Sequence, residues 1–86
     1  MPSYLVETYL PRGRVQERAA GERRARSAAD ELTRVRFEHS IHVPEDEICF
    51  YVFDAPSGRD AALAAERAEL DPIRIVEAAG APKEEL

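Results

Sequence analysis

Runs of β-branched and aromatic residues alternate along this chain with segments rich in alanine and charged residues. Four of these runs have the length and composition of β-strands: residues 4–10, 35–43, 48–53 and 73–78. The two longer segments between them, residues 14–32 and 57–70, are rich in the helix formers Ala, Glu and Arg. The pattern therefore predicts the element order β-α-β-β-α-β.

Proline, glycine and short polar residues mark the ends of these elements. The Pro-Arg-Gly segment at 11–13 ends the first strand. Ser57, followed three residues later by Asp60, resembles a helix capping box. The Asp-Pro pair at 71–72 ends the second helix, because the residue before a proline is driven out of the helical conformation. Gly21 lies inside the first predicted helix and weakens it by about 1 kcal/mol relative to Ala.

Right-handed crossovers in each βαβ unit convert this order into a ferredoxin-like α+β sandwich. An antiparallel sheet then carries both helices on one face and leaves the other face bare. We expect residues 1–79 to form one domain and residues 80–86 to form a flexible, charged tail.

The acidic turn at residues 44–47 sets the predicted register of the central hairpin. If these four residues form the loop, Val43 lies opposite Ile48 and His42 lies opposite Cys49. Side chains alternate between the two faces of a strand. The face assigned to the helices carries seven apolar residues: Val35, Phe37, Ile41, Val43, Ile48, Phe50 and Val52. The face with His42 and Cys49 is expected to look outward or into a dimer interface.

An imidazole and a thiolate on neighbouring strands can share a soft metal ion, because opposed residues have Cβ atoms about 4.5–5.5 Å apart. Two ligands are too few for a tight site, so a carboxylate such as Glu7, or a second subunit, is needed to complete it. We expect the metal ligands, in decreasing order, to be His42, Cys49, His39 and Glu7. Two other interpretations stay open, an inert cysteine beside a surface histidine and a catalytic Cys–His pair.

His39 and Glu7 each have a structural interpretation as well. His39 and His42 are three residues apart, which places them on opposite faces of a strand, so they cannot chelate one ion within a subunit. A packed, hydrogen-bonded histidine at the sheet edge is the plainer interpretation of His39. Glu7 lies in the middle of a strand, where a carboxylate needs a partner, and Arg74 on a neighbouring strand is a candidate.

Size and charge narrow the class of protein. A chain of 86 residues buries a small core, so symmetric self-association as a homodimer is expected. The net charge of −5 argues against nucleic-acid binding. Six arginines between residues 12 and 26 are interpreted as a solvated helix face. One cysteine without a secretory signal suits the cytoplasm, and no run is long enough to span a membrane. The high content of Ala and Arg indicates a bacterial genome rich in G and C.

Four segments together resemble a small bacterial family of unknown function whose actinobacterial branch is called nickel-binding. They are VETYLPRGR at 6–14, SIHVPEDEICF at 40–50, DAPS at 54–57 and DPIRIVEA at 71–78. The resemblance covers nearly the whole chain, roughly residues 3–78. It implies a ferredoxin-like subunit that dimerises and, for the named branch, nickel binding. The pair His39-Ser40 matches a His-Ser pair of many relatives, whereas His42 departs from the nickel-binding branch.

The sequence therefore leads us to expect a cytoplasmic homodimer with a non-catalytic, metal-binding role. Nickel is the first candidate, and zinc or copper also suits imidazole and thiolate ligands. The alternative is a dimeric α/β barrel that binds or converts a small organic molecule without a cofactor. Its pocket is expected to measure several hundred Å³ and to be lined by four residues: Tyr9, Tyr51, Phe53 and His42.

Overall fold

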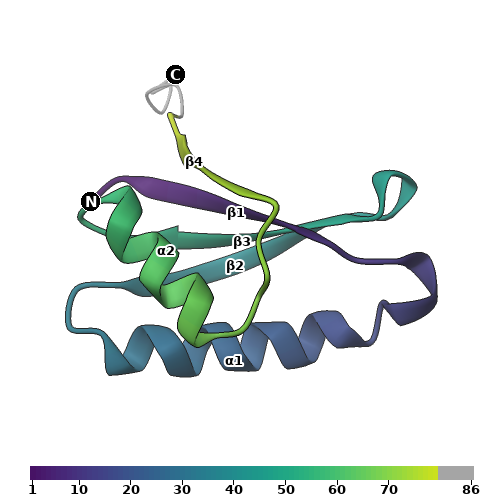
Figure 1. The fold of residues 1–86 in the computed structure, drawn as a ribbon, viewed down its shortest axis with the longest axis horizontal. Helices are drawn as coiled ribbons and strands as arrows, with labels where there is room; N and C mark the ends of the chain where they lie inside the picture. Colours follow the sequence, from purple (N-terminus) through teal and green to yellow (C-terminus); the bar gives the residue numbers. More distant parts are fainter. Residues whose placement is uncertain (80–86) are drawn as a thin grey trace, which may run out of the picture.

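The structure is a computed structural model that describes residues 1–79, so the predicted tail at 80–86 lies outside the described residues. The elements follow the predicted order (Figure 1). The strands are β1 (Ser3–Tyr9), β2 (Arg36–Val43), β3 (Ile48–Asp54) and β4 (Arg74–Ala78). The helices are α1 (Glu17–Glu31) and α2 (Gly58–Arg67), and 3-10 turns lie at Arg12–Arg14 and Pro44–Asp46.

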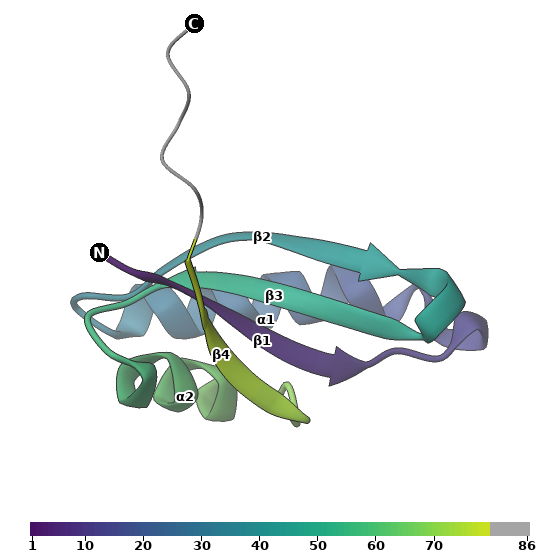
Figure 2. The same cartoon turned by 90° about the horizontal axis from the view of Figure 1, so that it is seen from above.

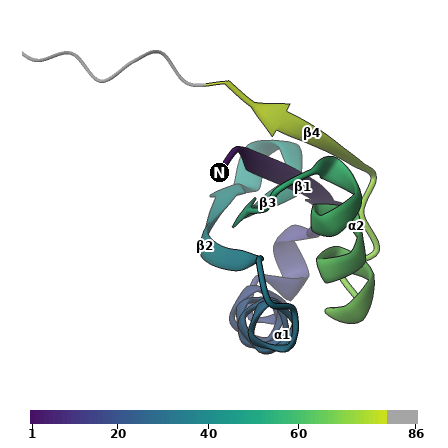
Figure 3. The ribbon, with the colours of Figure 1, turned by 90° about the vertical axis from the view of Figure 1, so that its left-hand side faces the viewer.

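The four strands form one antiparallel sheet in the order β2-β3-β1-β4. Both helices cover the same face, as the view along the sheet shows (Figure 3). Helix α1 contacts β2 and β3, whereas α2 contacts β1 and β4. Seen from above, the sheet lies nearer to the viewer than the helices do (Figure 2). The face of the sheet that is turned away from the helices carries no helix or strand of residues 1–79. This is a ferredoxin-like α+β fold, as the sequence predicted.

Local sequence signals predicted the start of α2 correctly but not its end. The backbone N–H of Asp60 donates to Ser57 Oγ at 3.3 Å, and the Ser57 hydroxyl donates to the Asp60 carboxylate at 2.8 Å. Ser57 is therefore confirmed as the N-cap, but the Asp60 carboxylate accepts from the Ser57 hydroxyl and not from its backbone N–H as in a capping box. The helix ends at Arg67, earlier than predicted, and the chain then turns through left-handed residues, Glu69 at φ 57° and Asp71 at φ 53°.

The predicted hairpin register is confirmed from the turn back to His39. His42 lies opposite Cys49, and His39 lies opposite Val52. The pairing then shifts by one residue at a bulge between Phe37 and His39, so Phe37 rather than the predicted Glu38 lies opposite Phe53. The bulge keeps the Phe37 side chain on the helix-covered face.

The predicted assignment of the hairpin faces was wrong. Cys49, Tyr51 and Phe53 point toward the helices, and their exposed fractions are 0 %, 4 % and 0 %. Both faces of β3 are apolar, so alternation along this strand alone could not show which face the helices cover. The helices present mainly alanine to the sheet, and these small residues leave room for large aromatic rings. The five residues predicted to face the helices but found on the bare face are Ile41, Val43, Ile48, Phe50 and Val52.

Gly21 provides the closest approach of α1 to the sheet. A Cβ atom at this position would lie 2.8 Å from Cζ of Tyr51 and closer still to the hydroxyl oxygen. The glycine that weakens the helix locally therefore leaves space for the end of a buried tyrosine.

Replacing Gly21 with alanine is expected to lower the free energy of unfolding by about 1–2 kcal/mol. The gain in helix propensity is about 1 kcal/mol, and overpacking against Tyr51 exceeds it. Urea unfolding followed by circular dichroism measures the change. The matched control is Gly13→Ala, because a Cβ at Gly13 meets nothing within 4 Å. A Gly21→Ala variant that is more stable than the unsubstituted protein would contradict the expected clash.

Candidate functional site

His42 and Cys49 lie side by side on β2 and β3, on the face that the helices cover. Their strands place them directly opposite each other, as the sequence predicted. The Cys49 side chain is fully buried, and His42 is partly buried. The Nε2 atom of His42 is buried and has no hydrogen-bond partner among the described residues. A buried imidazole nitrogen in a folded protein normally has a hydrogen-bond or metal partner.

A polar network from α1 lies beside this pair. Arg18 donates from Nε to Ser40 Oγ at 2.8 Å and from Nη2 to the Ser40 carbonyl at 3.1 Å. The Ser40 hydroxyl in turn donates to the Glu22 carboxylate. Sequence reasoning missed Arg18 and Glu22, because they belong to the arginine-rich helix that was interpreted as a solvated face. Their spacing of four residues, which places both on one side of a helix, was the available signal.

The environment keeps the Cys49 sulfur protonated. Burial raises the pKa of the Cys49 thiol, and the hydrogen bond with Tyr51 and the charge of Arg18 only partly oppose this shift. Burial and the neighbouring thiol raise the pKa of the Tyr51 hydroxyl to about 12. A buried thiol with a raised pKa is a poor nucleophile at neutral pH. The geometry therefore does not favour the catalytic Cys–His pair.

The other two predicted ligands lie on the bare face. Glu7 accepts a hydrogen bond from Arg74 Nε at 2.8 Å, which is the structural pairing considered for this residue. His39 is exposed opposite Val52. The structure therefore does not bring His39 or Glu7 to His42 and Cys49. Within residues 1–79, no group of three or more His, Cys, Asp or Glu side chains is placed to hold a metal ion.

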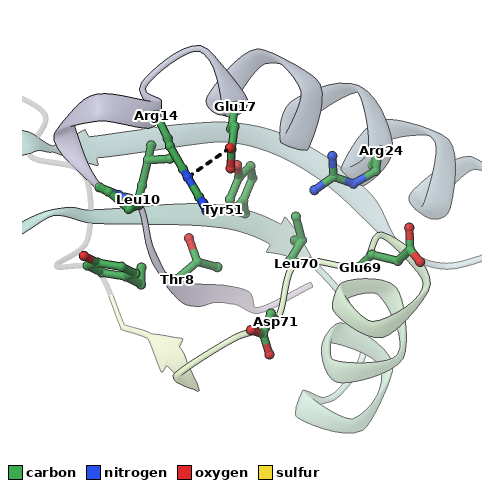
Figure 4. Close-up of a pocket in the computed structure, with 11 residues that line it drawn as sticks. Thr8, Leu10, Arg14, Glu17, Arg24, Tyr51, Glu69, Leu70 and Asp71 are labelled. Atoms are coloured by element: carbon green, nitrogen blue, oxygen red, sulfur yellow. Dashed lines mark ion pairs between the residues drawn. The ribbon is translucent and has the colours of Figure 1, made fainter.

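A polar cavity of about 280 Å³ opens at the end of β1, between the sheet, the start of α1 and the connection from α2 to β4 (Figure 4). Tyr9 and Tyr51 line this cavity. Phe53, by contrast, is fully buried in the core, and His42 does not line the cavity. This cavity lies on the helix side of the sheet, whereas the pocket predicted between the sheets of two subunits stays a prediction.

The bare face of the sheet, which we call the open face, is largely apolar. It extends over all four strands and carries apolar or ion-paired side chains, among them Leu5, Glu7, Tyr9, Ile41, Val43, Ile48, Phe50, Val52, Arg74 and Val76. Ile41 is 44 % exposed and Tyr9 is 62 % exposed. A contiguous apolar surface of this kind is typical of a protein interface.

Comparison of the chain with family models, with curated proteins and with solved structures finds no significant match. The fold therefore defines the class of the molecule, a small ferredoxin-like α+β protein. Its function has to be inferred from the fold and the side chains. Among residues 1–79, no helix combines the length and the apolar character needed to cross a bilayer.

Proposed function

We propose that this protein binds a divalent transition metal through His42 and Cys49, with nickel as the first candidate. The observation that carries the proposal is the buried Nε2 atom of His42, which lacks a partner among the described residues while its residue faces Cys49 across the hairpin. A metal ion between imidazole and thiolate would satisfy that nitrogen. Zinc and copper accept the same two donors, and the preference for nickel comes from the family resemblance.

Metal binding at this position has a chemical consequence for the cysteine. The thiol must lose its proton to become a ligand, and burial opposes that loss until a cation is present. Nickel loading is therefore coupled to proton release from Cys49. Two side chains leave coordination positions for solvent or for a small ligand. A ligand role of this kind needs no activated nucleophile, which suits a non-catalytic protein.

The proposed assembly is a homodimer formed by the open face. Its apolar side chains would be covered by the same surface of a second copy related by a two-fold axis. Pairing of two sheets in this way gives the α/β-barrel association predicted from the sequence. Cys49 is free and buried, which agrees with a reducing compartment such as the cytoplasm.

Replacing His42 with alanine is expected to lower nickel affinity at least tenfold, because the substitution removes the unpartnered nitrogen. Isothermal titration of nickel into untagged protein measures the change, since the imidazoles of an affinity tag would bind the metal themselves. His39→Ala is the matched control, because His39 lies on the same strand but on the opposite face. Equal nickel affinity of the unsubstituted protein and the His42→Ala variant would remove His42 as a ligand.

A second candidate function is the binding of a small organic molecule without a metal. One observation favours this function, the polar cavity, which Tyr51 and two arginines, Arg14 and Arg24, help to line. Binding in that cavity would survive treatment with a chelator, which separates the two candidates experimentally.

A further inference from the structure

The polar cavity has walls of opposite charge. Arg14, in the 3-10 turn after β1, and Arg24, on α1, line one side of it. Glu69 and Asp71, in the connection between α2 and β4, line the other side (Figure 4). Glu17 also lines the cavity, but its carboxylate lies 3.6 Å from Arg14 Nε. The cavity therefore presents guanidinium groups along one wall and carboxylates along the facing wall.

The charges on the two walls are only partly engaged by the protein itself. Arg24 donates from Nε to the Ala68 carbonyl at 2.8 Å, which anchors the side chain and leaves its terminal nitrogens available. Within residues 1–79, Arg24, Glu69 and Asp71 take part in no ion pair. A ligand that carries both signs of charge can therefore complement both walls, whereas a simple anion or cation complements one and is repelled by the other.

Tyr51 adds a buried hydroxyl group to the cavity. Its side chain is 4 % exposed, and its hydroxyl makes no hydrogen bond to a nitrogen or oxygen atom of the described residues. Gly21 leaves the space that this hydroxyl occupies beneath α1. The single proton of the Tyr51 hydroxyl is directed to the Cys49 sulfur, so the hydroxyl oxygen offers the cavity an acceptor.

We propose that the cavity binds a small amino-carboxylate zwitterion. The ligand carboxylate accepts hydrogen bonds from Arg24, and the ligand ammonium group is held by the carboxylates of Glu69 and Asp71. The volume of about 280 Å³ is below the usual range for drug-sized ligands, so a short-chain molecule is required. This inference gives a ligand class to the second candidate function and does not depend on metal binding at His42 and Cys49.

The test uses the full chain and three probes with the same carbon skeleton. These are 4-aminobutyrate, butyrate, which lacks the ammonium group, and butylamine, which lacks the carboxylate. Each probe is titrated into ¹⁵N-labelled protein, and the amide resonances of Gly21 and Leu70 report binding at the cavity. We expect 4-aminobutyrate to bind at least tenfold more tightly than either single-charge probe.

Single substitutions assign the contacts. Arg24→Gln and Asp71→Asn are each expected to weaken 4-aminobutyrate binding at least tenfold. Arg23→Gln is the matched control, because Arg23 is the neighbouring arginine on α1 and does not line this cavity. Both Arg24 and Asp71 are exposed, so neither substitution removes core packing.

The possible outcomes distinguish a failure of the proposed ligand class from a failure of the second candidate function. Equal binding of butyrate and 4-aminobutyrate, or unchanged binding by Arg24→Gln, would overturn the zwitterion while leaving small-molecule binding in place. If none of the three probes shifts a cavity resonance, the zwitterion is overturned. If the chelator-treated protein in addition binds no neutral polar molecule of the same length, the second candidate function fails as well. Neither result affects the proposal of nickel binding at His42 and Cys49, which the nickel titration tests separately.

Discussion

A glutamate in place of Ile41 is expected to dissociate the proposed homodimer into monomers. Ile41 is 44 % exposed on the open face and lies opposite Phe50 in the sheet. A two-fold interface contains this residue twice, and burial of an isoleucine contributes about 1.5–3 kcal/mol. Loss of both copies, together with the cost of burying two carboxylates, should raise the dissociation constant at least about a hundredfold.

Sedimentation velocity over a range of protein concentrations measures this change in assembly. Leu63→Glu is the matched control, because Leu63 is also an exposed apolar residue, at 38 %, but lies on α2. The control variant should sediment as the unsubstituted protein does. An Ile41→Glu variant that sediments as a dimer at low micromolar concentration would show that the open face is not the interface.

The second large effect concerns the two phenylalanines of β3. Replacing Phe53 with alanine is expected to lower the free energy of unfolding by about 3–5 kcal/mol. The Phe53 ring is fully buried under the helices, and its centroid lies 5.4 Å from that of Phe37. A loss of this size is a large share of the stability of so small a domain. Urea unfolding of the monomeric Ile41→Glu variant, with and without Phe53→Ala, separates folding from association.

Phe50→Ala in the same monomeric background is the control, since it removes the same ring three residues earlier on the opposite face of β3. We expect this variant to lose less than about 1.5 kcal/mol, because a ring on an uncovered face leaves no enclosed cavity when it is removed. If Phe50→Ala costs more than Phe53→Ala, the assignment of the two faces is reversed.

Local signals in the sequence were enough to predict the elements and their connections. The N-cap at Ser57 formed because its donors and acceptors lie within four residues of one another. The register from Val43 to His39 followed from a turn of four residues at 44–47. Interactions within a short stretch of chain do not depend on what packs against it, so a single sequence carries them.

Three features of the molecule could not be predicted without the tertiary structure. Both faces of β3 are apolar, so only the packing of α1 and α2 could decide that Cys49 is buried and Phe50 is not. The single-residue bulge before His39 depends on where Phe37 finds space. The opposition of Arg24 and Asp71 across the cavity joins residues far apart in the chain.

The sequence by itself therefore determined the order of strands and helices, the hairpin register and the pairing of His42 with Cys49. The tertiary structure decided which face of the sheet carries that pair, where the cavity opens and which charges line it. The physical reason is that alternation along a strand places residues on the same or on opposite faces. Which of those faces is covered is decided by the volumes of side chains on other elements, here alanine-rich helices that accept aromatic rings.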